Sequence, residues 1–173
     1  YLEKLGNAFE RVEGRIKSRM LGLYETTCRN CRCEFPFTSA VWEKGSCVEI
    51  RYEACPHCGD RQEKDCRPNK HDRELLQKIE RMKIKSWYPR NRLYYPDGMP
   101  FKEKQQYDSL DQLFTKRNLA ALAWLMEAIE EEPHRDLRDF LKIAFTSMVH
   151  LCTKMCPISE AGHFTPFSSA WVQ

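Results

Sequence analysis

The sequence contains no hydrophobic run that approaches the length of a membrane span, and its first residues lack the pattern of a secretory signal peptide. We therefore expect a cytoplasmic protein with no membrane partner. The seven glycines never form a Gly-x-Gly loop, so a glycine-rich cofactor-binding loop cannot be located. No nucleophile–base pair is discernible either, which argues against a hydrolase or a redox enzyme.

Positive charge is concentrated in the middle of the chain. The formal net charge of the 173 residues is only +3, but residues 61–92 contain eleven Lys and Arg against five Asp and Glu, a local +6. The other residues contain 17 against 20, or −3. This asymmetry predicts a basic face for an anionic partner. The alternative is a charged connector whose side chains all face water.

Cysteine is abundant, and its spacing is typical of a metal site. Nine cysteines, an odd number, favour reduced thiols over a disulfide framework. Two Cys-x-x-Cys turns, called knuckles below, are separated by 23 residues. Two residues between cysteines let one turn direct both thiolates at one point, and zinc takes four such ligands in a tetrahedron. The spacing therefore predicts a structural Zn²⁺ without an open position for a catalytic water, bound by Cys28, Cys31, Cys55 and Cys58.

The remaining cysteines leave alternatives for the ligand set. Cys33 can replace Cys31 in a shifted knuckle, whereas Cys47 and Cys66 are expected to pack or to remain free thiols. Gly59, directly after the second knuckle, allows the left-handed turn that such a loop needs. A segment with so little apolar mass is expected to need the metal in order to fold.

Apolar periodicity predicts an α+β fold, with a small β zinc ribbon and a mainly α-helical part that includes an antiparallel helix hairpin. Alternation over 48–52 predicts a strand facing 35–42, with a turn near 44–46, and Asp72 and Thr115 are predicted N-caps. The expected segments are an amphipathic helix that packs on the helical part (1–22), the zinc ribbon (23–67), a short helix and basic aromatic connector (68–107), the helical hairpin (108–156) and an irregular tail (157–173).

The predicted helices each have an apolar stripe at steps of three and four residues, which we expect to be buried. In the first helix the stripe is Leu2, Leu5, Phe9, Val12, Ile16 and Met20. In the helix over 116–132 it is Leu119, Leu122, Ala123, Met126 and Ile129. In the helix over 135–152 it is Leu137, Phe140, Leu141, Ala144, Phe145, Met148, Val149 and Cys152.

Five short runs follow one another in a distinctive order, namely Leu23–Cys28, Ser86–Pro89, Leu113–Leu122, Ala144–Ser147 and Thr153–Met155. Together with the zinc knuckles, they resemble a family of bacterial and archaeal DNA amino-methyltransferases of the adenine-N6 or cytosine-N4 type. Several members of that family are tied to phage defence or restriction–modification. The resemblance spans nearly the whole chain. It implies that this chain is a segment between the two catalytic halves of such an enzyme.

The catalytic motifs of that family do not occur in this sequence. A Gly-rich S-adenosylmethionine loop precedes such a segment in the family, and an Asp-Pro-Pro-Tyr-type motif follows it. We therefore predict no catalytic residue here, and S-adenosylmethionine is implied only for the full-length enzyme. The start at Tyr1, with no initiator methionine, agrees with a piece of a longer protein. The alternative is a stand-alone zinc-ribbon module that binds nucleic acid or protein.

DNA is the partner that the resemblance implies. Cations neutralise phosphates, and aromatic faces stack on extruded or single-stranded bases. Cations at a helix start oppose the helix dipole, which favours a phosphate contact there over a stabilising role. The alternatives are aromatic side chains packed in the core and a helix start that is simply capped. The candidate residues are Lys83, Lys85, Trp87, Tyr88, Arg90 and Arg92 with Tyr94 and Tyr95, then Lys116 and Arg117 with Thr115 and Asn118, and finally Arg29, Asn30 and Arg32.

Overall fold

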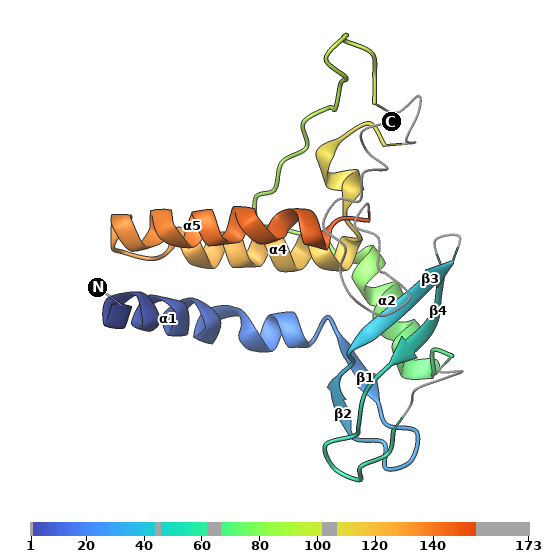
Figure 1. Cartoon of the computed structure of the whole chain (residues 1–173). Coiled ribbons are helices and arrows are strands. Elements are labelled where there is room, and N and C mark those ends of the chain that lie inside the picture. Colours follow the sequence, from blue (N-terminus) through green and yellow to red (C-terminus); the bar gives the residue numbers. More distant parts are fainter. Residues whose placement is uncertain (1, 44–45, 62–66, 102–106, 155–173) are drawn as a thin grey trace. The chain divides into compact units, whose positions relative to one another are not determined.

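The computed structural model describes residues 2–43, 46–61, 67–101 and 107–154, which form an α+β fold (Figure 1). The predicted fold class is therefore confirmed. The chain divides into two compact units: a ribbon unit, Lys17–Lys83, and a helical unit, Tyr1–Ile16 with Ile84–Gln173. The predicted tail over 157–173, most of the predicted turn and Cys66 lie outside the described residues.

Helix α1 (Leu2–Leu21) ends one residue before Gly22 and belongs to both units. Its buried residues, Ala8, Val12 and Ile16, follow one another at steps of four. The predicted stripe is wrong at two of its positions, because Leu2 is 83% exposed and Phe9 is 46% exposed. The small side chain of Ala8 is buried on the inner side of the helix instead. The predicted stripe was built from large apolar residues and therefore did not include this alanine.

The ribbon unit contains two small antiparallel sheets. Strand β1 (Glu25–Thr27) pairs with β2 (Glu34–Pro36), and β3 (Ser39–Glu43) pairs with β4 (Ser46–Arg51). The predicted pairing is confirmed for β3 and β4, where Ala40 faces Ile50. It is wrong for Phe35, which lies in β2 and faces Thr26 of β1. The first knuckle is the loop between β1 and β2, and the second follows β4.

Helix α2 (Lys70–Arg81) is attached to the ribbon through its first turn. Its N-cap is Asn69 rather than the predicted Asp72, which is the third helical residue and completes a reciprocal capping box with Asn69. Buried Asp72 also accepts a hydrogen bond of 2.7 Å from the hydroxyl of Thr26 in β1. This contact places α2 in the ribbon unit, although the sequence grouped it with the connector that follows.

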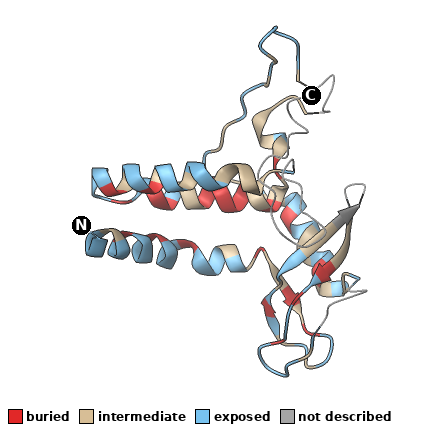
Figure 2. Cartoon of the chain, viewed as in Figure 1, coloured by how far each residue is buried: buried red, intermediate tan, exposed pale blue. Residues whose placement is uncertain are grey.

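The helical unit is built on an antiparallel hairpin of α4 (Lys116–Glu130) and α5 (Arg135–Val149), flanked by 3₁₀ turns η1 (Leu110–Leu113) and η2 (His150–Cys152) (Figure 1). The hairpin and the N-cap Thr115, which accepts a hydrogen bond from the amide of Asn118, are confirmed. The buried face of α4 is broader than a single stripe (Figure 2), since it includes Arg117, Ala120, Ala121, Trp124 and Ala128 as well as four of the five predicted positions.

Helix α5 has a narrower buried face than its sequence predicts. Only Leu137 and Leu141 are buried, while the partly buried Phe145 and Val149 pack against a buried cluster formed by Phe114, Leu119 and Leu122. The predicted inward positions Phe140, Ala144 and Met148 are wrong, because all three side chains are exposed. Ile143, one turn after Phe140, is also 65% exposed.

Candidate metal centre

The two knuckles have the same local backbone geometry. The amide of the residue after each second cysteine donates to the carbonyl of the first cysteine, from Arg32 to Cys28 over 3.0 Å and from Gly59 to Cys55 over 2.9 Å. Both of these donors have left-handed backbones, with φ of 63° at Arg32 and 72° at Gly59. The predicted role of Gly59 is therefore confirmed, and the first knuckle forms the same turn with an arginine.

The correspondence extends one residue further in each knuckle. The amide of Cys28 donates to the carbonyl of Cys33 over 2.9 Å, and the amide of Cys55 donates to the carbonyl of Asp60 over 2.7 Å. Each of these two residues also directs its side chain at the first cysteine of the other knuckle. The Sγ of Cys33 lies 3.1 Å from that of Cys55, and a carboxylate oxygen of Asp60 lies 3.7 Å from the Sγ of Cys28.

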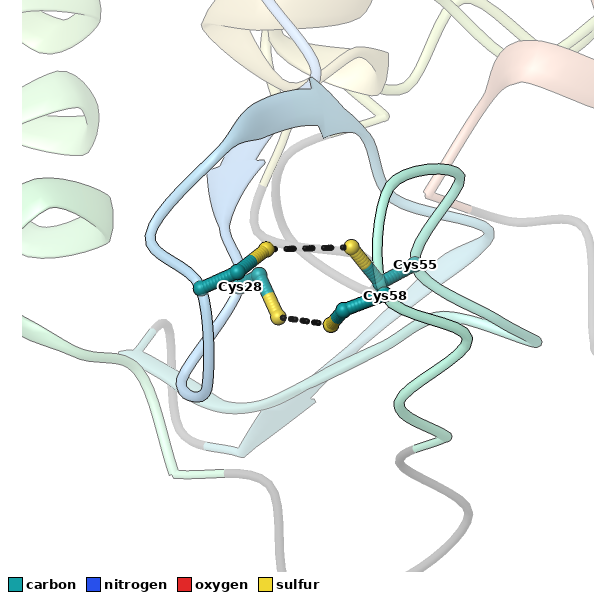
Figure 3. Close-up of side chains that lie close together, drawn as sticks. Cys28, Cys55 and Cys58 are labelled. Atoms are coloured by element: carbon teal, nitrogen blue, oxygen red, sulfur yellow. Dashed lines mark hydrogen bonds between the residues drawn. The ribbon is translucent and has the colours of Figure 1, made fainter.

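The sulfurs of Cys28, Cys31, Cys55 and Cys58 all lie within 4.8 Å of one another. Figure 3 shows Cys28 of the first knuckle opposite Cys55 and Cys58 of the second. The Cys28–Cys58 and Cys31–Cys55 sulfur pairs are both 3.6 Å apart. Zinc at about 2.3 Å from four sulfurs in a tetrahedron requires edges of about 3.8 Å. The four thiols therefore fit such an ion with little movement, and they can hold a metal ion such as zinc.

Cys33 does not belong to this group of four. Its sulfur is 3.1 Å from Cys55 and 3.3 Å from Cys31, closer than two ligands of one tetrahedral zinc can lie. Its position in the first knuckle is that of Asp60 in the second, which supports the unshifted ligand set. In the sequence, Cys33 and Asp60 each lie two residues after the second cysteine of their knuckle. This equal spacing relates the two residues only when the two turns are known to have the same geometry.

Two aromatic rings cover the inner side of the cluster. Phe35 and Tyr52 are buried with Cys28 and Cys55, and their rings meet edge to face with centroids 4.9 Å apart. The Tyr52 hydroxyl donates to a carboxylate oxygen of Asp60 over 3.0 Å. Burial and this hydrogen bond to the carboxylate raise the pKa of Tyr52 well above its usual value. The phenol therefore stays neutral and holds Asp60 beside the sulfurs.

The cysteines of the cluster differ in acidity. Burial opposes charge on Cys55, but hydrogen bonds from the Cys33 thiol and from two backbone amides outweigh it and lower the pKa of Cys55 to about 6. Backbone amides also favour the thiolates of Cys31 and Cys58, but burial and hydrogen bonds among the thiols raise both pKa values to about 11. A bound cation would favour the thiolate forms of Cys31 and Cys58, because metal ligation requires the deprotonated sulfur.

The predicted nucleic-acid residues are distributed over both units. Lys83 ends the ribbon unit, and the rest of the connector belongs to the helical unit. The exposed members of the predicted set are Lys83, Lys85, Trp87, Arg90 and Arg92, and Tyr94, Arg29, Asn30 and Arg32 are also exposed.

Three other members of the predicted set are covered to different extents. Tyr88 packs on the cluster formed by Phe114, Leu119 and Leu122, and Lys116 is half-buried. Arg117 is only 6% exposed, so its guanidinium does not have the exposed position that a phosphate contact needs. The reason is that α4 is buried along most of its circumference from its first turn.

Arg90 and Trp87 have different surroundings within the connector. The Arg90 guanidinium lies 4.6 Å from the centroid of the Tyr88 ring and donates to its hydroxyl over 2.7 Å, which leaves a fixed cation at the surface. Trp87 is 74% exposed but lines a pocket of about 460 Å³ whose other polar side chains are Glu127, Glu130 and Glu131. Carboxylates repel phosphates, so Arg90 is better placed than Trp87 for contact with a nucleic-acid backbone.

A second open pocket, of about 500 Å³, lies on the ribbon unit beside the end of β4. Arg51 and Arg61 line it, together with Glu53 and the hydroxyl-bearing side chains Thr38 and Ser39. Arg51 is also paired with Glu49 on its own strand. Neither arginine was among the predicted contact residues, although Arg61 is the first cation of the basic stretch 61–92, because the two are ten residues apart and only the fold brings them together.

The left-handed arginine provides a test of the knuckle geometry. Arg32→Gly is expected to raise the free energy of unfolding of the zinc-loaded ribbon by up to about 1 kcal/mol, because glycine adopts φ of 63° without strain. Gly59→Ala is the matched change in the other knuckle and is expected to lower it by about 1 kcal/mol. Competition with a chelator measures both effects as opposite changes in zinc affinity. Equal affinities for both variants would contradict the matched turns.

Among the described residues, no helix combines the length and the apolar character needed to cross a membrane. Comparison of the chain with known proteins found no matching family model, no matching curated sequence and no matching solved structure.

Proposed function

We propose that this chain is a zinc-ribbon insert of a cytoplasmic DNA amino-methyltransferase, and that it contacts the DNA target or positions the flanking catalytic halves. The convergence of four thiols from two matched knuckles is the observation that supports the zinc ribbon, and the methyltransferase part of the proposal rests on the sequence resemblance. With four protein ligands there is no open position for water, so the ion would be structural rather than catalytic. A bound zinc would cross-link the two knuckles, and the residues around it would supply the binding surfaces.

The charge distribution supports an anionic partner for the ribbon unit. Lys17–Lys83 contains 14 Lys and Arg against 11 Asp and Glu, a net +3, whereas the helical unit contains 14 of each and is neutral. The pocket at Arg51 and Arg61 adds hydroxyl groups that can donate to phosphate oxygens. In the helical unit, Arg90 and Arg92 are exposed cations suited to the same contact.

DNA binding by the full chain is expected to be weak and steeply dependent on salt. Arg90→Ala and Arg92→Ala are each expected to lower the affinity and to reduce the slope of log K against log salt by about 1, because each removes one phosphate contact. A mobility-shift titration at several salt concentrations measures both quantities. Arg135→Ala is the control, since Arg135 is an exposed cation of α5 that already lies 3.8 Å from Asp139.

The outcome separates the two roles of the proposed insert. Absent or salt-independent binding would remove DNA contact and leave the scaffolding role. Tight binding of S-adenosylmethionine by this chain alone, measured by calorimetry, would contradict an insert that lacks the cofactor loop.

A stand-alone zinc-ribbon module that binds protein is the second candidate. The observation that favours it is the exposed apolar row on α5, formed by Phe140, Ile143 and Met148. Phe140 and Ile143 are neighbours on the helix surface, and exposed Ala144 connects Phe140 to Met148 at steps of four, so this apolar row is suited to a protein surface rather than to DNA. If DNA binding is absent, this row is the surface through which a protein partner, including a flanking catalytic half, would be bound.

A further inference from the structure

Cys33 is a fifth thiol in direct contact with the four-cysteine cluster. Its sulfur lies 3.1 Å from the Sγ of Cys55 and 3.3 Å from that of Cys31, and it is not required as a ligand. Cys33 is half-buried, whereas Cys55 is only 2% exposed. The same position in the second knuckle is occupied by Asp60, which cannot undergo thiol chemistry. The first knuckle therefore has an additional thiol that can be oxidised, and the second knuckle does not.

We propose that Cys33 is a site of reversible oxidation, at which a peroxide joins Cys33 to Cys55 in a disulfide and so removes one of the four metal ligands. The inference rests on the proposed zinc site. Cys55 is the expected partner because it comes from the other knuckle and is the nearest sulfur. A bond to Cys31 would instead close a small strained ring through one intervening residue.

The chemistry is balanced by one molecule of hydrogen peroxide. The Cys33 thiol first loses its proton to solvent, the thiolate sulfur attacks one peroxide oxygen, the O–O bond breaks, and the departing hydroxide takes up a proton from solvent to leave as water, giving a sulfenic acid. The Cys55 thiolate then attacks the Cys33 sulfur, the S–S bond forms, and the sulfenic hydroxide takes a proton from solvent to leave as a second water. The two sulfurs lose two electrons, which reduce the peroxide. Three remaining thiolates no longer fill the tetrahedron of a structural zinc.

The experiment treats the zinc-loaded full chain with one equivalent of hydrogen peroxide and follows zinc release with a chelating dye. The wild-type chain is expected to lose its zinc and to yield a Cys33–Cys55 bridge on peptide mapping, and dithiothreitol is expected to restore binding. C33S is expected to retain most of its zinc under the same treatment. C47S is the matched control, because Cys47 belongs to the same unit but its thiol donates to the carbonyl of Glu49, and it should behave as wild type.

Two results would overturn the inference. One is loss of zinc from C33S at the wild-type rate, and the other is an oxidised wild-type chain without the Cys33–Cys55 bridge. The second result needs no variant and holds even if C33S does not fold. A chain that never binds zinc would instead refute the proposed zinc ribbon itself, so the two failures are distinguishable.

Discussion

Cys55→Ser is expected to abolish zinc binding and to unfold the ribbon unit. The knuckles are held together by few apolar contacts, since only Cys28, Phe35, Tyr52 and Cys55 form the buried cluster there. Structural zinc sites of this kind contribute about 10–16 kcal/mol of apparent binding free energy at neutral pH, which is also folding free energy. Losing one ligand from the buried side of the site therefore removes more stability than such a small core supplies.

Elemental analysis and amide NMR spectra of the full chain measure this result. The expected spectrum of C55S has collapsed dispersion for residues 17–83, and a chelator added to wild-type protein should reproduce it. Cys47→Ser is the control, because it removes a thiol from the same unit without touching the four ligands. A chain that keeps a dispersed ribbon spectrum without any bound metal would show that apolar packing is sufficient and would contradict the structural role of the ion.

The convergence of the four cysteines could be predicted from the sequence because a knuckle is a local structure. Four residues determine each turn, and the pairing of two turns follows from their equal spacing. The position of Cys33 could not be predicted in the same way, because its spacing to Cys28 also permits a shifted knuckle. The left-handed backbone at Arg32 supports the unshifted knuckle, and an arginine gives no sign in the sequence of adopting that conformation.

The helices could be predicted in position but not in the width of their buried faces. A period of 3.6 residues identifies the inner side of α5, yet Phe140 at the margin of that side is exposed, and so is Met148 in the last turn of the helix. The width depends on which neighbours cover each helix. In α4 the buried face extends to Arg117, a cation that the sequence suggested for the surface. Such coverage is a property of tertiary packing, so periodicity within one helix does not determine it.

The ion pair between Arg11 and Glu132 in the helical unit could not be predicted from the sequence either, because the two residues are 121 positions apart. Glu132 follows α4 and is fully buried, and it accepts two hydrogen bonds from the Arg11 guanidinium of α1, over 2.8 and 3.1 Å. Its backbone carbonyl accepts a further hydrogen bond from Arg138. In the sequence, Glu132 is one of three consecutive glutamates before Pro133. Nothing in the sequence distinguishes it from the other two as the buried partner of an arginine.

Glu132→Gln is expected to lower the free energy of unfolding of the helical unit by about 1–3 kcal/mol, because it removes the charge from a buried, doubly hydrogen-bonded acceptor. Thermal and urea unfolding followed by helical circular dichroism measure the change. Glu131→Gln is the matched control, since the neighbouring carboxylate is 61% exposed and 3.6 Å from Arg15. We expect it to change stability by less than about 0.5 kcal/mol, as surface ion pairs usually do.

The pH dependence of this difference identifies its origin. Hydrogen bonds from Arg11 outweigh burial and hold the pKa of Glu132 below its usual 4.5. A lowered pKa in the folded state means that the carboxylate stabilises the fold fully above about pH 4.5, and that this contribution disappears as the pH falls through the lowered value. The gap between wild type and Glu132→Gln should therefore be constant near neutral pH and close in acid. A gap that persists unchanged in acid would show that the glutamine disturbs packing, rather than removing a charge that Arg11 stabilises.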